Sequence, residues 1–239
     1  MCGRYTLTAP IDDVVEVFEV GHLSFGDWSP RFNIAPSQTA PVLLQSGEGE
    51  RRLGPMGWGL VPAWARDPKI GHRLINARSE TIWSKPAFRG AARRRRCVVP
   101  MDGFFEWRAT PGAAGVKPVK SPFWIHRPDR RVFGVAGVWE RWRNPADEAD
   151  ARVTFAVLTT EASGWMRPLH ERMPVVLSAE GTAAWLDPSK DRAELEGLLR
   201  PAANDVLEAW EVSRAVNRPV HDGPELIERL PDGVAIPSG

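Results

Sequence analysis

The residue types that could do chemistry begin at Cys2, in the stretch MCGRYTL. Cysteine is small enough for removal of Met1 to be expected, and the new terminus would carry an amine and a thiol on adjacent carbons. An α-amine has an unperturbed pKa of about 7.7 to 8.0, against about 10.4 for lysine, so it is far more often neutral at pH 7. This amine would form an imine with an aldehyde, and the thiol would then close a five-membered thiazolidine ring. The alternative is that Cys2 is a small, buried apolar residue.

Two further residues have side chains suited to proton transfer. Glu106 lies among aromatic residues in GFFEW, where desolvation would raise the pKa of its carboxyl group toward neutrality. His170 lies between two prolines in PLHERMP, beside a charged pair, and an imidazole exchanges protons near neutral pH. Each also has a structural interpretation, as a strand glutamate that points to water and as a histidine held in a loop.

Asn76 and Arg78, in the stretch INARSE, are candidates for substrate binding. An asparagine amide can orient a substrate oxygen or a neighbouring side chain, and an arginine suits a phosphate group. The alternative for Asn76 is a helix cap. The sequence has no CxxC or HExxH motif and no glycine-rich phosphate-binding loop, so we expect no metal and no cofactor.

The composition restricts the function further. The chain has 239 residues, of which 43% are hydrophobic and 26% charged, enough for a folded core. Its 31 basic and 30 acidic side chains give a net charge of +1, so any nucleic-acid site must be a local patch. The densest basic segment is the arginine run 93–96, where we expect a solvated strand edge or turn.

The two cysteines, Cys2 and Cys97, do not form a disulfide framework, and we assign Cys97 to the core. No apolar segment is long enough to span a membrane, and no secretory signal is apparent at the start of the chain. We therefore expect a cytoplasmic protein without membrane association.

Short helices and strands must position these residues. Apolar spacing predicts a helix at 12–20, and the Ala, Arg and Ser content predicts one at 76–95 that Pro86 bends or ends. Two short helices are expected within 178–200, capped by Ser178 and by Ser189 or Asp191. The sequence also predicts strands at 42–44, 97–109 and 209–217, and two more within 121–162 that are joined by a surface loop at 143–150. Loops or turns are expected at 31–41, 51–67 and 102–103, and a frayed tail beyond Leu230.

These elements alternate without a regular βαβ period. The order favours a single α+β domain with a mostly antiparallel sheet or a barrel-like β core and flanking short helices.

The motifs taken together resemble the SRAP family, the SOS-response-associated peptidase or abasic-site processing proteins. The matching blocks are MCGRY, RFNIAPSQ, WGLVPAWARD, NARSET, VVPMDGFFEW, TTEAS, PLHERMPV and VNRPVHDGPELIE. They occur in order from Cys2 to about Glu228, so the resemblance implies a domain over 1–230 and a C-terminal tail at 231–239.

The resemblance implies a sensor that covalently traps abasic sites in single-stranded DNA, through a thiazolidine crosslink at Cys2 after loss of Met1. At the matching positions, Asn76 would hold the reacting sugar or the N-terminus, and Glu106 would shuttle protons during imine formation. His170 would assist opening of the sugar ring or reversal of the link. Lyase activity and self-processing peptidase activity, a hydrolase function, are further expectations.

Contacts to DNA phosphates would come from Arg4, Arg78 and Arg172, and Trp64 would stack on a base or separate the strands at a single-strand/double-strand junction. With few phosphate contacts, the logarithm of the binding constant should fall with the logarithm of the salt concentration, by a slope of about 0.7 for each phosphate contacted. We expect a monomer that is cytoplasmic and nucleoid-associated when bound to DNA.

Two other functions stay open from the residues alone. An N-terminal-nucleophile cysteine hydrolase or glutamine amidotransferase also exposes a cysteine after loss of Met1, and it would release ammonia from glutamine. A non-catalytic single-strand binding module would bind DNA equally well without Cys2.

Overall fold

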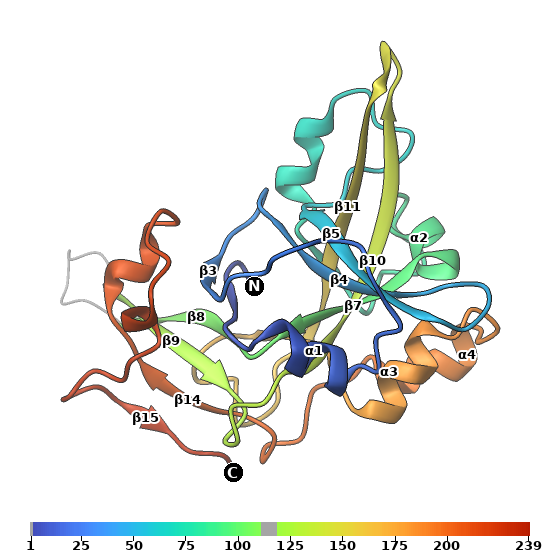
Figure 1. Ribbon diagram of the computed structural model, residues 1–239. Helices are drawn as coiled ribbons and strands as arrows, with labels where there is room; N and C mark the ends of the chain where they lie inside the picture. The colour runs from blue at the N-terminus through green and yellow to red at the C-terminus, as the bar shows by residue number, and fades with distance from the viewer. Residues whose placement is uncertain (1, 111–118) are drawn as a thin grey trace.

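The computed structural model describes residues 2–110 and 119–239, and Met1 lies outside them. These residues form one α+β domain built on two sheets, with the short helices on the outside (Figure 1). No helix in this described part of the chain is long and apolar enough to cross a membrane.

The larger sheet closes into a barrel. Its strands follow the order β11–β10–β7–β4–β5, and β5 pairs with β11 again, in parallel. They span Thr39–Gln45 (β4), Arg51–Trp58 (β5), Arg96–Met101 (β7), Phe133–Asn144 (β10) and Asp147–Glu161 (β11). Short strands extend it at His22–Leu23 (β2), Asn76–Arg78 (β6), Arg172–Pro174 (β12) and Val176–Leu177 (β13). The predicted barrel-like core is confirmed, and β10 and β11 continue beyond it as a long hairpin (Figure 1).

The smaller sheet is antiparallel, in the order β15–β14–β9–β8–β1–β3. Its strands span Tyr5–Leu7 (β1), Arg31–Ile34 (β3), Gly103–Thr110 (β8), Val119–His126 (β9), Glu208–Glu211 (β14) and Ala235–Ile236 (β15). The main hydrophobic core takes side chains from both sheets, for example Tyr5 and Phe104 from this sheet and Val98 and Phe155 from the barrel.

The chain crosses from the barrel to the smaller sheet at Asp102, between the end of β7 and Gly103, the first residue of β8. The buried carboxylate of Asp102 accepts hydrogen bonds from the side chain of Thr8 (2.7 Å) and the backbone of Ala9 (3.0 Å), which joins this crossing to the chain after β1. A Cβ atom at Gly103 would lie 2.2 Å from Nε1 of Trp124, so only glycine fits there.

Short helices flank the sheets. The α-helices span Ile11–Val17 (α1), Arg89–Arg94 (α2), Ala179–Leu186 (α3) and Arg192–Leu195 (α4). The 3₁₀-helices span Pro68–Arg73 (η1), Glu196–Leu198 (η2), Arg214–Asn217 (η3) and Pro224–Leu226 (η4). Two predicted caps are confirmed: the Ser178 hydroxyl accepts from the backbone of Gly181 (3.0 Å), and Asp191 forms a capping box with Glu194.

The expected loop at 51–67 is wrong in its first half, which forms the barrel strand β5. Pro55 of β5 lies opposite Pro41 of β4. Neither proline has an N–H group, so the two can face each other at a pair position that exchanges no hydrogen bonds. A stretch rich in glycine and proline, a composition typical of turns, can therefore form a barrel strand here. The expected loop at 31–41 likewise contains the strand β3.

The expected helix at 76–95 is also wrong for most of its length. Asn76–Arg78 is the strand β6, paired in parallel with β11, and only Arg89–Arg94 is helical, after Pro86. The arginine run is not uniformly solvated either. Arg96 is 8% exposed and donates to the backbone oxygens of Trp185 (2.7 Å) and Asp187 (2.5 Å), so it ties β7 to the end of α3.

The tail expected to fray is attached to the domain. Ala235–Ile236 pairs with β14, the Trp165 indole donates to the backbone oxygen of Pro237 (2.6 Å), and the Gly239 N–H donates to that of Asn204 (3.0 Å).

Candidate active site

Cys2 belongs to the main hydrophobic core and directly precedes the segment that leads into β1, the strand paired with β8. The first strand pairs with β8 at Tyr5 and Phe104, and the Phe105 N–H donates to the Arg4 oxygen (3.0 Å). If this antiparallel register is continued toward the N-terminus, Gly3 lies opposite Glu106, and Cys2 is the next residue. Cys2 is fully buried, and its Sγ lies 3.9 Å from the Arg4 oxygen, a weak contact.

Asn76 makes the direct contact with Cys2. Its side-chain nitrogen donates to the Cys2 carbonyl oxygen at 2.7 Å, and β6 holds it in place because Asn76 pairs with Val157 of β11. The side-chain oxygen of Asn76 is buried and accepts no hydrogen bond from any residue in 2–110 or 119–239. It is therefore an acceptor suited to a donor supplied by the N-terminus or a substrate.

Glu106 supplies the acidic group. It is 3% exposed in β8, and burial raises the pKa of its carboxyl group, while the charge of His170 acts in the opposite direction. Burial, and next the charge of Glu106, raise the pKa of the Cys2 thiol well above its ordinary range. The thiol is therefore a neutral S–H group at physiological pH, beside a carboxyl group able to hold a proton.

His170 is held by its backbone and by one ring nitrogen. Its N–H donates to the Met166 oxygen (3.1 Å), and its Nδ1 lies 2.9 Å from the Arg172 N–H and 3.2 Å from the Arg172 oxygen. When Nδ1 accepts from Arg172, the neutral ring carries its proton on Nε2. The β12 backbone thereby fixes the orientation of the imidazole.

The structure thus brings the four predicted residues together from separate parts of the chain. A hydrogen bond joins Asn76 to Cys2, and electrostatic interactions join Glu106 to both Cys2 and His170. Among the residues that the structure describes, no group of His, Cys, Asp and Glu side chains could hold a metal ion. The arrangement offers a nucleophile, a hydrogen-bonding amide and two proton-transfer groups.

A family model matches most of the chain. The model of SOS response associated peptidase (SRAP) matches residues 1–219. The chain belongs to the SRAP family. The abasic site processing protein YoqW of Bacillus subtilis (strain 168) is 40% identical over 230 residues, which cover 95% of this chain and 99% of YoqW.

More distant relatives and a solved structure extend the similarity. The abasic site processing protein HMCES of Xenopus tropicalis is 28% identical over 275 residues, which cover 96% of this chain and 78% of HMCES. A crystal structure of a protein from Bacteroides thetaiotaomicron matches with a TM-score of 0.82 at 26% identity, over 96% of this chain and all of that one (100%). The predicted family and fold class are confirmed.

In this SRAP domain, Arg4 is occupied by contacts within the protein. Its guanidinium donates to the side-chain oxygen of Asn33 (2.8 Å) and to the backbone oxygens of Val216 (2.7 Å) and Asn217 (3.3 Å). Buried Asn33 in turn donates to the His221 oxygen (2.8 Å). The chain just before β1 is thereby joined to η3. Sequence reasoning missed this contact because Arg4 and its partners Val216 and Asn217 lie more than 200 residues apart.

Arg172 is paired as well. It forms a two-pronged ion pair with Glu80 (2.6 and 3.0 Å), donates to the Thr159 oxygen (2.7 Å), and has a side chain only 14% exposed. The hydrogen bond from Arg172 lowers the pKa of Glu80. Glu80 was not predicted, although its place two residues after Arg78 in NARSET is a signal for it.

The other two predicted DNA contacts face solvent. Arg78 is exposed on β6, two residues after Asn76. Trp64 is 61% exposed and lines a hollow of about 350 Å³ together with three basic residues, Arg66, Lys69 and Arg73, and one acidic residue, Asp67. This hollow is a local basic patch around an aromatic ring, on a chain with almost no net charge.

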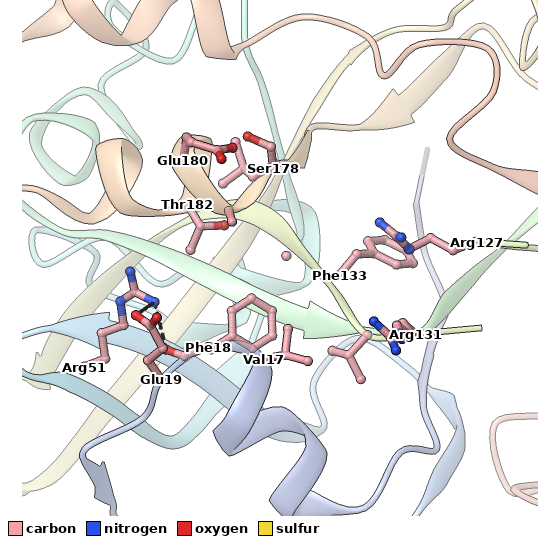
Figure 2. Close-up of a pocket in the computed structure, with 14 residues that line it drawn as sticks. Val17, Phe18, Glu19, Arg51, Arg127, Arg131, Phe133, Ser178, Glu180 and Thr182 are labelled. Atoms are coloured by element: carbon pink, nitrogen blue, oxygen red, sulfur yellow. Dashed lines mark hydrogen bonds and ion pairs between the residues drawn. The ribbon is translucent and has the colours of Figure 1, made fainter. Parts of the chain in front are cut away.

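A cavity of about 450 Å³ lies elsewhere, lined by the end of α1, the start of β10 and the start of α3 (Figure 2). Two of its arginines are already paired, Arg51 with Glu19 (3.1 Å) and Arg127 with Asp129 (2.7 Å). None of the four candidate catalytic residues lines this cavity, so it is separate from the candidate active site.

Proposed function

We propose that this protein traps abasic sites in single-stranded DNA by forming a thiazolidine at Cys2 after removal of Met1. The observation that carries the proposal is the 2.7 Å hydrogen bond from Asn76 to the Cys2 carbonyl, beside the buried carboxyl group of Glu106. Its relatives YoqW and HMCES are named abasic site processing proteins, and the proposal extends that activity to this chain.

The proposed chemistry balances without an oxidant or reductant. The ring-opened deoxyribose presents an aldehyde, and the Cys2 amine adds to its C1′ to give a carbinolamine. Loss of one water gives an imine, and the thiol sulfur adds to the imine carbon while its proton passes to the nitrogen. The products are one thiazolidine and one water, and breakage of the Met1–Cys2 peptide bond consumes one water beforehand.

Each neighbouring residue has a proposed role in these steps. Protonated Glu106 donates to the leaving hydroxyl of the carbinolamine and then, as a carboxylate, accepts the thiol proton. Asn76 holds the Cys2 carbonyl through its nitrogen and accepts from the amine through its buried oxygen. His170 assists opening of the sugar ring and, in reverse, release of the link.

The proposed DNA contacts follow the exposure of the residues. Arg78 binds a backbone phosphate, and Trp64 stacks on a base at a single-strand/double-strand junction. That Arg4 and Arg172 also contact phosphates stays a prediction, because their guanidinium groups already bind protein oxygens. The proposal includes a monomer, localised in the cytoplasm, as the acting species.

Denaturing gel electrophoresis tests the proposal. The protein, with loss of Met1 verified by mass spectrometry, is incubated with single-stranded DNA that contains one abasic site, beside an intact strand and the Cys2→Ala variant. A shifted band that survives SDS and requires both the abasic site and Cys2 is expected. Absence of this band, together with release of ammonia from glutamine, would favour the amidotransferase instead.

A further inference from the structure

A small hydrophobic cluster lies apart from the main core and packs against the segment 59–74, which carries Trp64. It consists of Val61, Ala65 and Trp142, with Ile70 packed against it. Trp142 is fully buried and belongs to the part of β10 that pairs with β11 but not with β7. The β10–β11 hairpin projects beyond the barrel (Figure 1). A buried tryptophan is a large packing group for so small a cluster.

Both strands of the hairpin hold this segment by hydrogen bonds. The Trp142 indole N–H donates to the Ala65 oxygen at 2.7 Å, and the Val61 N–H donates to the Thr154 hydroxyl of β11 at 2.8 Å. The guanidinium carbon of Arg152 lies 5.6 Å from the centre of the Trp142 ring, on the neighbouring strand. The indole is therefore held between the segment and β11.

The base of the segment is closed tightly. Gly59 has a φ of +125°, and a Cβ atom on it would lie 2.7 Å from the Gly71 oxygen. The Leu60 N–H also donates to the Leu74 oxygen at 3.1 Å. The two ends of the segment are thus fixed to each other, and the orientation of the segment relative to the hairpin depends on its contacts with β10 and β11.

The side chain of Trp64 is not part of this cluster and faces solvent. Trp64 directly precedes Ala65, whose oxygen Trp142 binds, and it is 61% exposed. An exposed ring that stacks on a base gains most when its position is fixed before binding, because less conformational entropy is then lost.

From this geometry we infer that Trp142 is a positioning residue for Trp64, and that the β10–β11 hairpin sets the preference for a DNA junction over a uniform single strand. The inference rests on the proposed function. Its ligand is the exposed face of a base at the junction, which an aromatic ring recognises by stacking. Trp142 itself touches only the protein.

The test compares crosslinking rates on two abasic-site DNAs, one fully single-stranded and one with the site at a junction. Trp142→Phe keeps an aromatic ring in the cluster and removes its N–H. We expect it to lower the ratio of the junction rate to the single-strand rate by about fivefold, the size expected for one neutral hydrogen bond. Thr154→Val, which removes the other hydrogen bond, should change the ratio in the same direction.

Two comparisons separate positioning from a general effect on folding. Trp139→Phe, in the same strand but packed on the main core, should leave the ratio unchanged. In a Trp64→Ala background, Trp142→Phe should cause no further change in the ratio.

An unchanged ratio in both Trp142→Phe and Thr154→Val, with both variants folded by circular dichroism, would overturn the inference. So would an effect of Trp142→Phe that persists fully without Trp64. Failure of the proposed function is a distinct result, because the wild-type protein would then form no adduct with either DNA.

Discussion

The side-chain nitrogen of Asn76 donates a 2.7 Å hydrogen bond to the backbone oxygen of Cys2, across 74 positions of sequence. Parallel pairing of β6 with β11 places the amide there, and pairing of β1 with β8 brings Cys2 to it. Two independent strand pairings therefore determine where the N-terminus lies.

Loss of the Asn76 amide should slow crosslinking without unfolding the protein. Asn76→Asp keeps the size of the side chain but sets a carboxylate against the Cys2 carbonyl, so the hydrogen bond is replaced by repulsion. We expect the single-turnover rate with excess protein to fall at least tenfold, since an unfavourable contact adds to the lost bond. Asn204→Asp is the matched control and should keep the wild-type rate, because Asn204 is exposed and an aspartate oxygen can still accept from the Trp165 N–H.

The buried carboxyl group of Glu106 should impose a pH dependence on stability. Burial raises its pKa in the folded protein above the unfolded value of about 4.3, so the stability linked to its protonation is complete below about pH 4.3. That stability is lost as pH rises through the folded pKa. The glutamine of Glu106→Gln stays neutral at every pH, so the stability of this variant relative to wild type should increase as pH rises above about 4.3.

Urea unfolding at several pH values measures this difference, and a constant difference across the range would contradict it. The same substitution should also slow crosslinking, because the amide cannot donate an acid proton or accept one. A variant that reacts at the wild-type rate would remove Glu106 from the proposed mechanism.

His126 should make the fold sensitive to acid. It is fully buried, its ring lies 4.1 Å from that of Trp124, and burial lowers its pKa to about 4. Because the folded pKa lies below the ordinary value of about 6.5, the stability linked to the neutral ring is complete above about pH 6.5 and is lost toward pH 4. We expect a loss of about 2 to 3 kcal/mol from this residue.

The His126→Phe variant, which keeps an aromatic ring beside Trp124, isolates this contribution. Its free energy of unfolding should vary less than that of the wild type between about pH 7 and 4. Parallel pH profiles for the two proteins would show that His126 is not the source.

Arg4 and Arg78 should respond differently to the same substitution. Arg4→Met leaves the side-chain oxygen of Asn33 without the Arg4 donor and removes one of the two hydrogen bonds to the Val216 oxygen, the other coming from Asn33. We therefore expect the free energy of unfolding to fall by about 2 kcal/mol. Exposed Arg78→Met should change stability by less than about 0.5 kcal/mol. It should instead weaken binding to single-stranded DNA and reduce the salt dependence of binding, the slope of the log binding constant against log salt concentration, by about 0.7.

Thermal unfolding and fluorescence anisotropy at several salt concentrations check both variants. If Arg4→Met were as stable as wild type and altered only the salt slope, Arg4 would be a phosphate contact after all.

Local chemistry explains which features could be predicted from the sequence. The helix caps Ser178 and Asp191 depend on neighbours in the chain, so the local sequence was enough to predict them. The pairing of Pro41 with Pro55 and the contacts of Arg4 depend on strand register and on a segment at the far end of the chain. For Asn76, the residue was identified but its bond to Cys2 required the β6–β11 pairing.

The most direct test of the central claim is the mass of the adduct. Protein without Met1 is incubated with a short oligonucleotide that carries one abasic site, and the product is weighed intact and mapped by tandem mass spectrometry. The account predicts the sum of the two masses less one water, with the modification on Cys2 and stable without a reducing agent. An unmodified protein, or an adduct on any other residue, would contradict it.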